Sequence, residues 1–339
     1  MARLAGIAQL VEQRIRNAKV VGSTPISGTN QQGSPATAFF VCGYSPIRRL
    51  AVSKNKMTVR NVRVAARVSA ALALACVAGA CGHVADDSVR SAAFDTYGRL
   101  AAWPGKKSVA CPAQDRNTAV LLLIGQSNTG NHAEQKHTSA FGARVLNYFD
   151  DKCYIAGSPL LGTTGSAGES WTLLGNKLLA AGLFGQVILV PAGINGTPIS
   201  RWQKGGDLNE MLMGVLDAVR KRYRITHILW HQGEVDFILK TGEDDYRTRF
   251  GSLVSSIRDQ RIDAPMFASV ATRCAPDWTA DNPTARAQKA LPGLAQLVFS
   301  GVDTDALIGG ADRHDTCHFG AAGQEKFARA WVDIIQRLR

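Results

Sequence analysis

No segment of the sequence repeats at the period of a solenoid protein, and no two of the cysteines after residue 81 stand at the C-x-x-C spacing typical of zinc sites. A repeat architecture is therefore excluded, and zinc binding by cysteine has little support. The chain also lacks an apolar run of about 20 residues, the length that a membrane-spanning helix needs. With 339 residues and 45% apolar content, it can still bury a full α/β core.

Acidic residues are nearly absent from the first 81 positions, which hold 11 Lys and Arg but one Glu. The rest of the chain holds 28 basic and 26 acidic residues. The formal net charge of +12 is thus concentrated in the N-terminal segment, which carries +10, whereas the remainder carries only +2. A polyanion-binding surface on the folded part loses its main support, so we expect no nucleic-acid partner.

The N-terminal segment divides into two parts. Residues 6–29 resemble the conceptual translation of a transfer-RNA gene and have little apolar periodicity. We therefore predict that residues 1–56 are a spurious upstream or disordered segment. From residue 57 the composition changes. The stretch MTVRNVRVAAR carries three arginines, the next stretch, SAALALACVAGA, consists mainly of small and apolar residues, and Cys81 follows. This order is typical of a bacterial export signal.

The letters AGAC at residues 78–81 resemble a lipobox, which predicts a signal peptide over residues 57–81 and lipidation of Cys81. A plain secretory signal and a short membrane anchor remain the alternatives. We expect an exported protein, either a periplasmic or outer-membrane lipoprotein or a secreted one, that contacts a membrane only through its lipid.

Four cysteines follow the signal, and an even number in an oxidising compartment predicts two disulfides. Of the three possible connectivities we favour Cys111 with Cys153 and Cys274 with Cys317. Residues 82–117 are expected to form a tether and lead-in, since Pro104 and Gly105 break any regular element there.

Strands and helices alternate over residues 118–339. Apolar runs of strand length occupy residues 119–125, 186–192, 226–231 and 265–272, and apolar residues recur at helical spacing over 208–219, 246–257 and 321–338. This alternation predicts an α/β fold of three layers, α/β/α, with a mostly parallel central sheet. In such folds the ligand crevice lies beyond the carboxyl ends of the strands.

Polar clusters follow these strands, and a fourth lies near the end of the chain. They read GQSN at residues 125–128, GINGT at 193–197, HQGEVD at 231–236 and DRHDTCHFG at 312–320. The carboxyl ends of parallel strands meet at one edge of a sheet. We therefore expect all four clusters to converge there.

Taken together, these blocks resemble those of the SGNH hydrolases, and best the carbohydrate and sialic-acid-specific acetylesterase branch, whose first block reads GQSN. The similarity runs from Ala119 to Arg339 and implies a flavodoxin-like SGNH hydrolase fold. The chain departs from the pattern at Asn195 and Gly196, where many relatives carry Gly-Gly. The Asn of the superfamily's third block is also missing, and the resemblance implies Gln232 as its substitute.

Ester cleavage needs a serine whose proton an adjacent base can take, and a third group that orients the base. Ser127 is the candidate nucleophile, His318 the base and Asp315 the orienting carboxylate; His314 and Asp312 are alternative choices for the last two. The tetrahedral intermediate needs preorganised donors for its oxyanion. The candidates are the backbone N–H groups of Ser127 and Gly196 and the side-chain amide of Gln232. We expect neither a cofactor nor a metal.

Other side chains in the clusters are candidates for substrate contacts: Gln126, Asn128, Trp202, His231 and Glu234. Each also has a structural interpretation. Glu234 and its neighbour Asp236 are expected to bind loop backbone, and His231 to be a neutral structural histidine. Trp202 either flanks a sugar ring or covers the crevice.

Two further residues have a plainer interpretation than a functional one. Arg201 is expected to reach solvent rather than attract an anionic sugar. Cys317 is expected to be in a disulfide or inert rather than a nucleophile.

The sequence thus predicts a serine esterase that removes acetyl groups from an O-acetylated glycan through an acyl-enzyme. Within the same fold, a lipid or short-acyl esterase or a lysophospholipase is the alternative, and a glycan O-acetyltransferase is another. A non-hydrolytic glycan-binding module is disfavoured because the set Ser127, Asp315 and His318 is complete. The sequence leaves the oligomeric state open.

Overall fold

The computed structural model describes residues 91–337. The predicted upstream segment, the signal peptide over residues 57–81 and the lipidation site Cys81 lie outside the described residues, so these three expectations stay predictions. Within residues 91–337 no helix combines the length and the apolar character that crossing a membrane would require.

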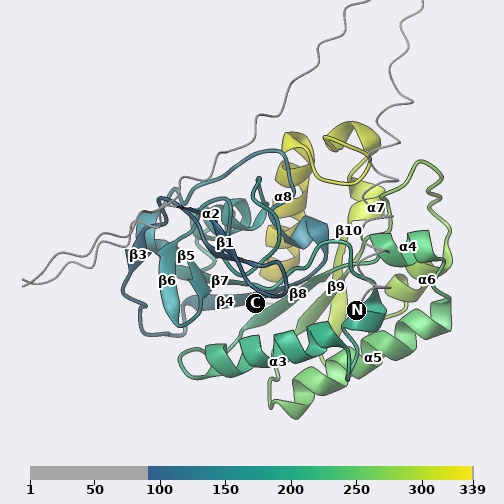
Figure 1. Ribbon diagram of the computed structural model, residues 1–339, viewed down its shortest axis with the longest axis horizontal. Helices are drawn as coiled ribbons and strands as arrows, with labels where there is room; N and C mark the ends of the chain where they lie inside the picture. Colours follow the sequence, from purple (N-terminus) through teal and green to yellow (C-terminus); the bar gives the residue numbers. More distant parts are fainter. Residues whose placement is uncertain (1–90, 338–339) are drawn as a thin grey trace, which may run out of the picture. The chain divides into compact units, whose positions relative to one another are not determined.

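An eight-stranded, mostly parallel sheet forms the middle of the described chain (Figure 1). Its central strand β4 (Thr118–Gly125) is buried along its whole length. Alternate side chains of β4 enter different cores, Val120, Leu122 and Ile124 in one and Ala119, Leu121 and Leu123 in the other. Since successive strand residues point to opposite faces, both faces of the sheet are covered.

The strand order is β10-β9-β8-β4-β7-β5-β6-β3. The strands that complete the parallel part are β5 (Val145–Phe149), β7 (Gln186–Pro191), β8 (His227–His231), β9 (Met266–Val270) and β10 (Val298–Asp303). Without β5 and the two strands beyond it, the order in chain numbering is 2-1-3-4-5, that of flavodoxin-like folds. After β4 the chain forms β5, β6 and β7 on one side of that strand and then β8 on its other side, so the topological switch point lies at the end of β4.

Helices cover the sheet on both sides, as predicted. One core contains side chains of α3 (Asp207–Arg220), α5 (Glu243–Asp259) and α6 (Pro283–Lys289). The other contains side chains of α2 (Trp171–Ala180) and α8 (Ala321–Arg337). Figure 1 shows α3 and α5 on one side of the sheet and α2 and α8 on the other. The short helices α4 (Glu234–Leu239) and α7 (Thr304–Leu307) lie in the connections that follow β8 and β10.

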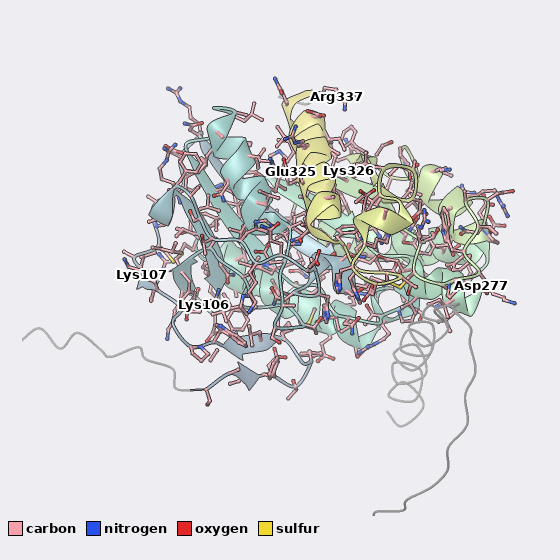
Figure 2. The ribbon with its side chains drawn as sticks, turned by 90° about the horizontal axis from the view of Figure 1, so that it is seen from above. Lys106, Lys107, Asp277, Glu325, Lys326 and Arg337 are labelled. Carbon is pink, nitrogen blue, oxygen red and sulfur yellow. A yellow bond between two sulfur atoms is a disulfide. The ribbon has the colours of Figure 1, made fainter. Side chains whose placement is uncertain are left out.

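Residues 91–117 correct the expectation of a tether. They contain β1 (Ala93–Phe94), β2 (Leu100–Ala102) and β3 (Ser108–Val109), and β3 extends the sheet by pairing with β6 (Lys152–Ile155). A disulfide between Cys111 and Cys153, one of the two favoured from the sequence, joins this segment to β6. Lys106 and Lys107 lie in the connection that leads to β3 (Figure 2). The segment is too short and too polar for apolar periodicity to reveal these strands.

Candidate active site

The loop after β4 begins with a glycine that its surroundings require. Gly125 has φ +138°, and a Cβ at this position would lie 2.0 Å from the carbonyl oxygen of His231. Only glycine adopts this backbone freely, so the chain can turn sharply where the strand ends. Two residues later Ser127 opens the 3-10 turn η1 (Ser127–Thr129). The turn therefore delivers Ser127 to the switch point of the sheet.

The terminal loop supplies a histidine and a carboxylate that face one another. Nδ1 of His318 lies 2.8 Å from Oδ2 of Asp315, and Oδ1 of Asp315 accepts the backbone N–H groups of Cys317 (2.7 Å) and His318 (2.6 Å). Burial alone would raise the pKa of Asp315, but the hydrogen bonds and charge of His318 lower it well below its usual range. The carboxylate stays ionised and can orient the ring of His318.

Asn128 joins this terminal loop to the turn that carries Ser127. Its Nδ2 donates to the carbonyl of Cys317 at 3.2 Å, and its Oδ1 accepts the N–H of Phe319 at 3.2 Å. The neighbour of Ser127 in the chain is thus bonded to both residues that flank His318. Nε2 of His318 is buried and has no hydrogen-bond partner in the described part of the chain. This is the nitrogen that a general base must keep free.

We expect Asn128→Ala to lower kcat about 10- to 100-fold with little change in KM. The variant loses the two hydrogen bonds to the residues that flank His318, the expected base, and each is worth about 1 kcal/mol. The matched control is Asn176→Ala, which removes a similar pair of bonds, to Thr138 and Ala140, on the distant helix α2. Steady-state kinetics on both variants test the role, and equal kcat values would contradict it.

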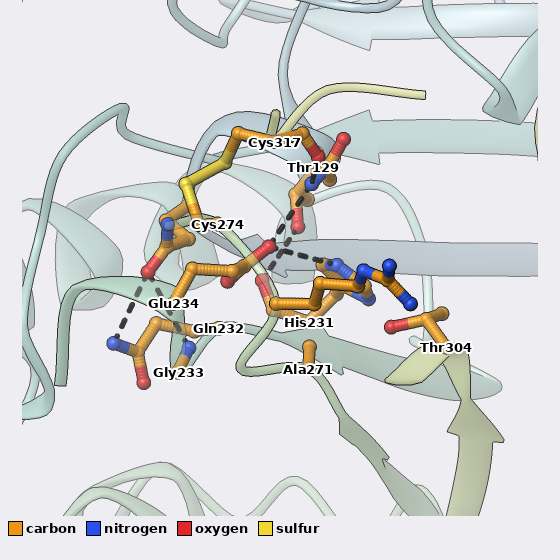
Figure 3. Close-up of polar contacts among 12 residues, drawn as sticks. Thr129, His231, Gln232, Gly233, Glu234, Ala271, Cys274, Thr304 and Cys317 are labelled. Carbon is orange, nitrogen blue, oxygen red and sulfur yellow. Dashed lines mark hydrogen bonds and ion pairs between the residues drawn. A yellow bond between two sulfur atoms is a disulfide. The ribbon is translucent and has the colours of Figure 1, made fainter. Parts of the chain in front are cut away.

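The burial of His231 agrees with its interpretation as a structural histidine and rules out the alternative that it contacts substrate, and the same alternative fails for Glu234. Their side chains are 1% and 0% exposed, and Nε2 of His231 lies 3.3 Å from Oε1 of Glu234 (Figure 3). The same Oε1 accepts Nδ2 of Asn128 at 3.0 Å. Asn128 is itself 3% exposed, so it too bonds protein rather than substrate. The three side chains form a buried polar network beneath the terminal loop, since a buried carboxylate needs such partners.

Gln126 and Gln232 also bond internally. Oε1 of Gln126 accepts the backbone N–H groups of Gly233 (3.4 Å) and Val235 (3.2 Å), which fixes the loop after β8. Nε2 of Gln232 donates to the carbonyl of Thr197 at 3.0 Å and to Asp236. Its amide therefore has no proton left to aim at an oxyanion, which corrects the expected third donor.

Gln232→Ala is accordingly expected to act on stability. It leaves the buried acceptors of Thr197 and Asp236 without their donor, and such a loss costs about 1–3 kcal/mol for each group. Burial already raises the pKa of Asp236 to about 6, so its carboxylate form depends on the hydrogen bonds that it accepts. Denaturant unfolding should show a loss of about 2–4 kcal/mol, against almost none for the control Gln260→Ala. Unchanged stability with a reduced kcat would restore Gln232 as an oxyanion donor.

Trp202 and Arg201 both contact other parts of the protein. The Trp202 side chain is fully buried, packs edge-to-face on Trp230 at 5.5 Å and donates from Nε1 to Oγ1 of Thr197 at 3.1 Å. Its ring is part of the core, which corrects both interpretations made from the sequence. Arg201 forms a two-point ion pair with Asp207, at 3.0 and 2.5 Å, rather than extending free into solvent.

Two of the three expected oxyanion donors remain. The backbone N–H groups of Ser127 and Gly196 donate to no other group among residues 91–337. Gly196 adopts φ +67°, and the N–H of Asn195 before it is held by Oγ1 of Thr164 at 2.9 Å. A fixed loop with a free donor meets the requirement for preorganised stabilisation of developing charge.

A second disulfide, Cys274–Cys317, ties the loop after β9 to the terminal loop (Figure 3). It is the other pair favoured from the sequence. Cys317 lies directly before His318, so the cross-link constrains the segment that holds the base. Because its sulfur is oxidised, Cys317 is not a nucleophile.

The alternative choices for base and carboxylate have other partners. Asp312 accepts the N–H of Gly309 and binds Nζ of Lys326 on α8 at 2.8 Å, and Figure 2 shows Lys326 beside Glu325 on that helix. Nε2 of His314 donates to the carbonyl oxygen of His132 at 3.0 Å. Neither takes the place of Asp315 beside His318.

Sequence reasoning missed two residues of this site. His132 stacks on His318, with ring centroids 5.5 Å apart, and burial, with the charge of His318, lowers its pKa to about 3. Arg313 is 8% exposed and donates to the carbonyl of Cys317. His132 stands only five residues after Ser127, which was the one available signal. One imidazole-rich group, His314, Asp315 and His318, has the composition of a metal site.

A family model for carbohydrate esterases, sialic acid-specific acetylesterase, matches residues 117–337. The chain belongs to this family. It is therefore a carboxylic ester hydrolase that removes acetyl groups from carbohydrate, and the match spans the sheet from β4 onward, the Ser127 turn and the terminal loop. No curated protein sequence is similar enough to count as a relative.

Several solved structures resemble the chain. A protein of Arabidopsis thaliana is 18% identical, with 65% of this chain and 98% of that one covered and a TM-score of 0.49. NanS is 18% identical, with 65% and 97% covered and a TM-score of 0.47. Axe2, an acetylxylan esterase from Geobacillus stearothermophilus, is 17% identical, with 64% and 94% covered and a TM-score of 0.41.

Proposed function

We propose that this chain deacetylates an O-acetylated glycan by a Ser-His-Asp mechanism, with Ser127 as nucleophile and an acetyl-enzyme as intermediate. The observation that carries the proposal is the geometry of His318. Its Nδ1 is held by Asp315, its Nε2 is free, and its loop is bonded to the residue next to Ser127. This is the arrangement that activates a serine hydroxyl.

In the first half-reaction Nε2 of His318 takes the proton of the Ser127 hydroxyl as Oγ attacks the acetyl carbonyl carbon. The carbonyl oxygen becomes an oxyanion and receives hydrogen bonds from the N–H groups of Ser127 and Gly196. The C–O bond to the sugar then breaks. His318 returns its proton to the departing sugar oxygen, which leaves as a hydroxyl group.

In the second half-reaction water attacks the acetyl group on Ser127. His318 takes a proton from the water, a second oxyanion forms at the same donors, and the bond to Oγ breaks. Acetate leaves and Ser127 recovers its proton from His318. Asp315 keeps its charge throughout and stabilises the imidazolium form of His318 in both steps.

The test is an assay of acetate release by the purified chain from acetylated monosaccharides and acetylated polysaccharide. p-Nitrophenyl esters of increasing length and lysophospholipid serve as comparison substrates. We expect the highest kcat/KM on acetylated sugar. Faster turnover on long acyl chains or lysophospholipid would favour the lipid esterase alternative. Acetyl transfer to an added sugar without free acetate would favour the transferase.

We also propose that the protein is exported and lipid-anchored, on the strength of the Arg-rich, small-apolar and Cys order over residues 57–81. The expected result of Cys81→Ser is loss of acylation and of membrane partitioning, with esterase activity unchanged, because the active site lies beyond residue 118. Intact mass and N-terminal sequencing of the native protein measure acylation and the position of the mature N-terminus. A mature chain that retains residues 1–56 would refute the prediction that this segment is spurious, and an unmodified N-terminus would refute lipidation alone.

A further inference from the structure

His132 contacts both the terminal loop and the segment that supports the loop over residues 193–197 (the oxyanion loop). Its ring stacks on the ring of His318, with centroids 5.5 Å apart and an interplanar angle of 23°. Its backbone carbonyl accepts Nε2 of His314 at 3.0 Å, and its own Nε2 lies 3.2 Å from Oγ1 of Thr164. The proposed mechanism gives His132 no role.

Thr164 holds the oxyanion loop, which carries the N–H donor of Gly196. Its hydroxyl accepts the N–H of Asn195 at 2.9 Å, and its own N–H donates to the carbonyl of Gly193 at 3.1 Å. The position of the Gly196 donor therefore depends on Thr164. The side chain of Thr164 is fixed in turn by the group that accepts its hydroxyl proton.

The hydroxyl proton of Thr164 has two candidate acceptors, Nε2 of His132 at 3.2 Å and the carbonyl oxygen of Gly193 at 3.5 Å. That oxygen has two lone pairs, and it already accepts the Thr163 hydroxyl at 2.6 Å and the Thr164 N–H at 3.1 Å. The proton therefore goes to Nε2 of His132. Such an acceptor must be a neutral ring, and burial, together with the charge of His318, lowers the pKa of His132 to about 3.

We propose that His132 is a positioning residue that couples the base to the oxyanion loop. Its ring packs against His318, and its Nε2 fixes the Thr164 hydroxyl that holds Asn195. Base and oxyanion donors act in the same step, and a misplacement of about 1 Å can cost about a hundredfold in rate. Since His132 stays neutral, it does not repel the imidazolium form of His318. The inference rests on the proposed function.

The test removes one link at a time. H132F keeps a ring beside His318 but has no acceptor for the Thr164 hydroxyl, whereas H132Q keeps an oxygen that can accept it and loses the ring. T164V removes the hydroxyl, and T164S retains it. We expect H132F, H132Q and T164V to lower kcat about 10- to 100-fold with KM within about twofold. T164S should stay within about threefold of the native kcat.

The double variant H132F/T164V tests the coupling. If His132 acts on the oxyanion loop through the Thr164 hydroxyl, the double variant should have a kcat within about twofold of that of T164V alone. Losses that multiply would show independent roles and overturn the coupling. Native kcat in either His132 variant, or a T164S variant as slow as T164V, would overturn it as well.

The matched control is T226V. Oγ1 of Thr226 also accepts a backbone N–H, that of Val120 at 2.9 Å, and lies 2.8 Å from Nδ1 of His227, but near the amino ends of β4 and β8. T226V should lower the thermal unfolding midpoint as T164V does, yet keep kcat within about twofold. An equal fall in kcat would mean that lost stability slows the enzyme, and would overturn the proposal. A native chain inactive on every ester would refute the proposed function and this inference with it, whereas an active chain with unaffected His132 variants would refute the inference alone.

Discussion

Ser127→Ala should lower kcat by about four to six orders of magnitude while the chain folds normally. The variant loses the oxygen that attacks the acetyl carbon, whereas the N–H groups proposed to stabilise the oxyanion are backbone and remain. Combining it with His318→Ala should cost little more than either change alone, because nucleophile and base act as one unit. Initial rates of acetate release measure the effect.

The matched control for this variant is Ser269→Ala on β9, which removes a buried hydroxyl that has no hydrogen-bond partner among residues 91–337. Its kcat should stay within a factor of about two. Near-normal turnover by Ser127→Ala on any good substrate would eliminate the serine mechanism, whatever the control shows.

The second large effect is expected from Asp315→Asn, with a loss of about three to four orders of magnitude in kcat near neutral pH. The asparagine oxygen can still accept the backbone N–H groups of Cys317 and His318, so the loop keeps its shape. Its NH₂ group, however, faces Nδ1 of His318 and requires that nitrogen to be bare. The ring proton moves to Nε2, and the base is lost.

Asp312→Asn is the control in the same loop, since its carboxylate bonds Gly309 and Lys326 instead of the catalytic ring. A pH series of unfolding adds an independent check. The pKa of Asp315 is lower in the folded chain than the unfolded value of 3.8, so its contribution to stability is present above that pH and is lost on acidification. The native chain should therefore lose stability more steeply below pH 4 than Asp315→Asn. Parallel curves would show that the carboxylate is not held as the structure indicates.

The sequence predicted the elements whose burial imposes a simple period. Strands β4, β7, β8 and β9 are apolar runs buried on both faces, and α3, α5 and α8 each bury one stripe, so their predicted bounds agree with the structure to within two or three residues. The strands β1, β2 and β3 have two or three residues each and are held by pairing and a disulfide. Their stabilisation comes from distant partners, which leaves no local pattern to detect.

In the site, the pairing of Asp315 with His318 was predictable from the sequence, because nucleophilic catalysis restricts which residue types can serve as base and orienting group. The destination of polar side chains was not. Gln232 and Trp202 stand in the expected loops, yet the fold turns both inward, toward Thr197 and Trp230. Whether such a side chain contacts substrate or the protein interior depends on partners tens of residues away in the chain. Residue spacing within a single loop does not identify those partners.

The edge strand β3 limits how readily one molecule can add its sheet to that of another. At the β3 end the sheet finishes in a strand of only two residues, Ser108 and Val109, stapled beside β6 by Cys111–Cys153. An edge strand of this length offers another chain few unpaired backbone groups to pair with. If the disulfide were reduced and β3 detached, β6 would become the edge strand and expose the N–H and C=O groups that now pair with β3. The same bridge that extends the fold thus also keeps neighbouring molecules from joining their sheets edge to edge.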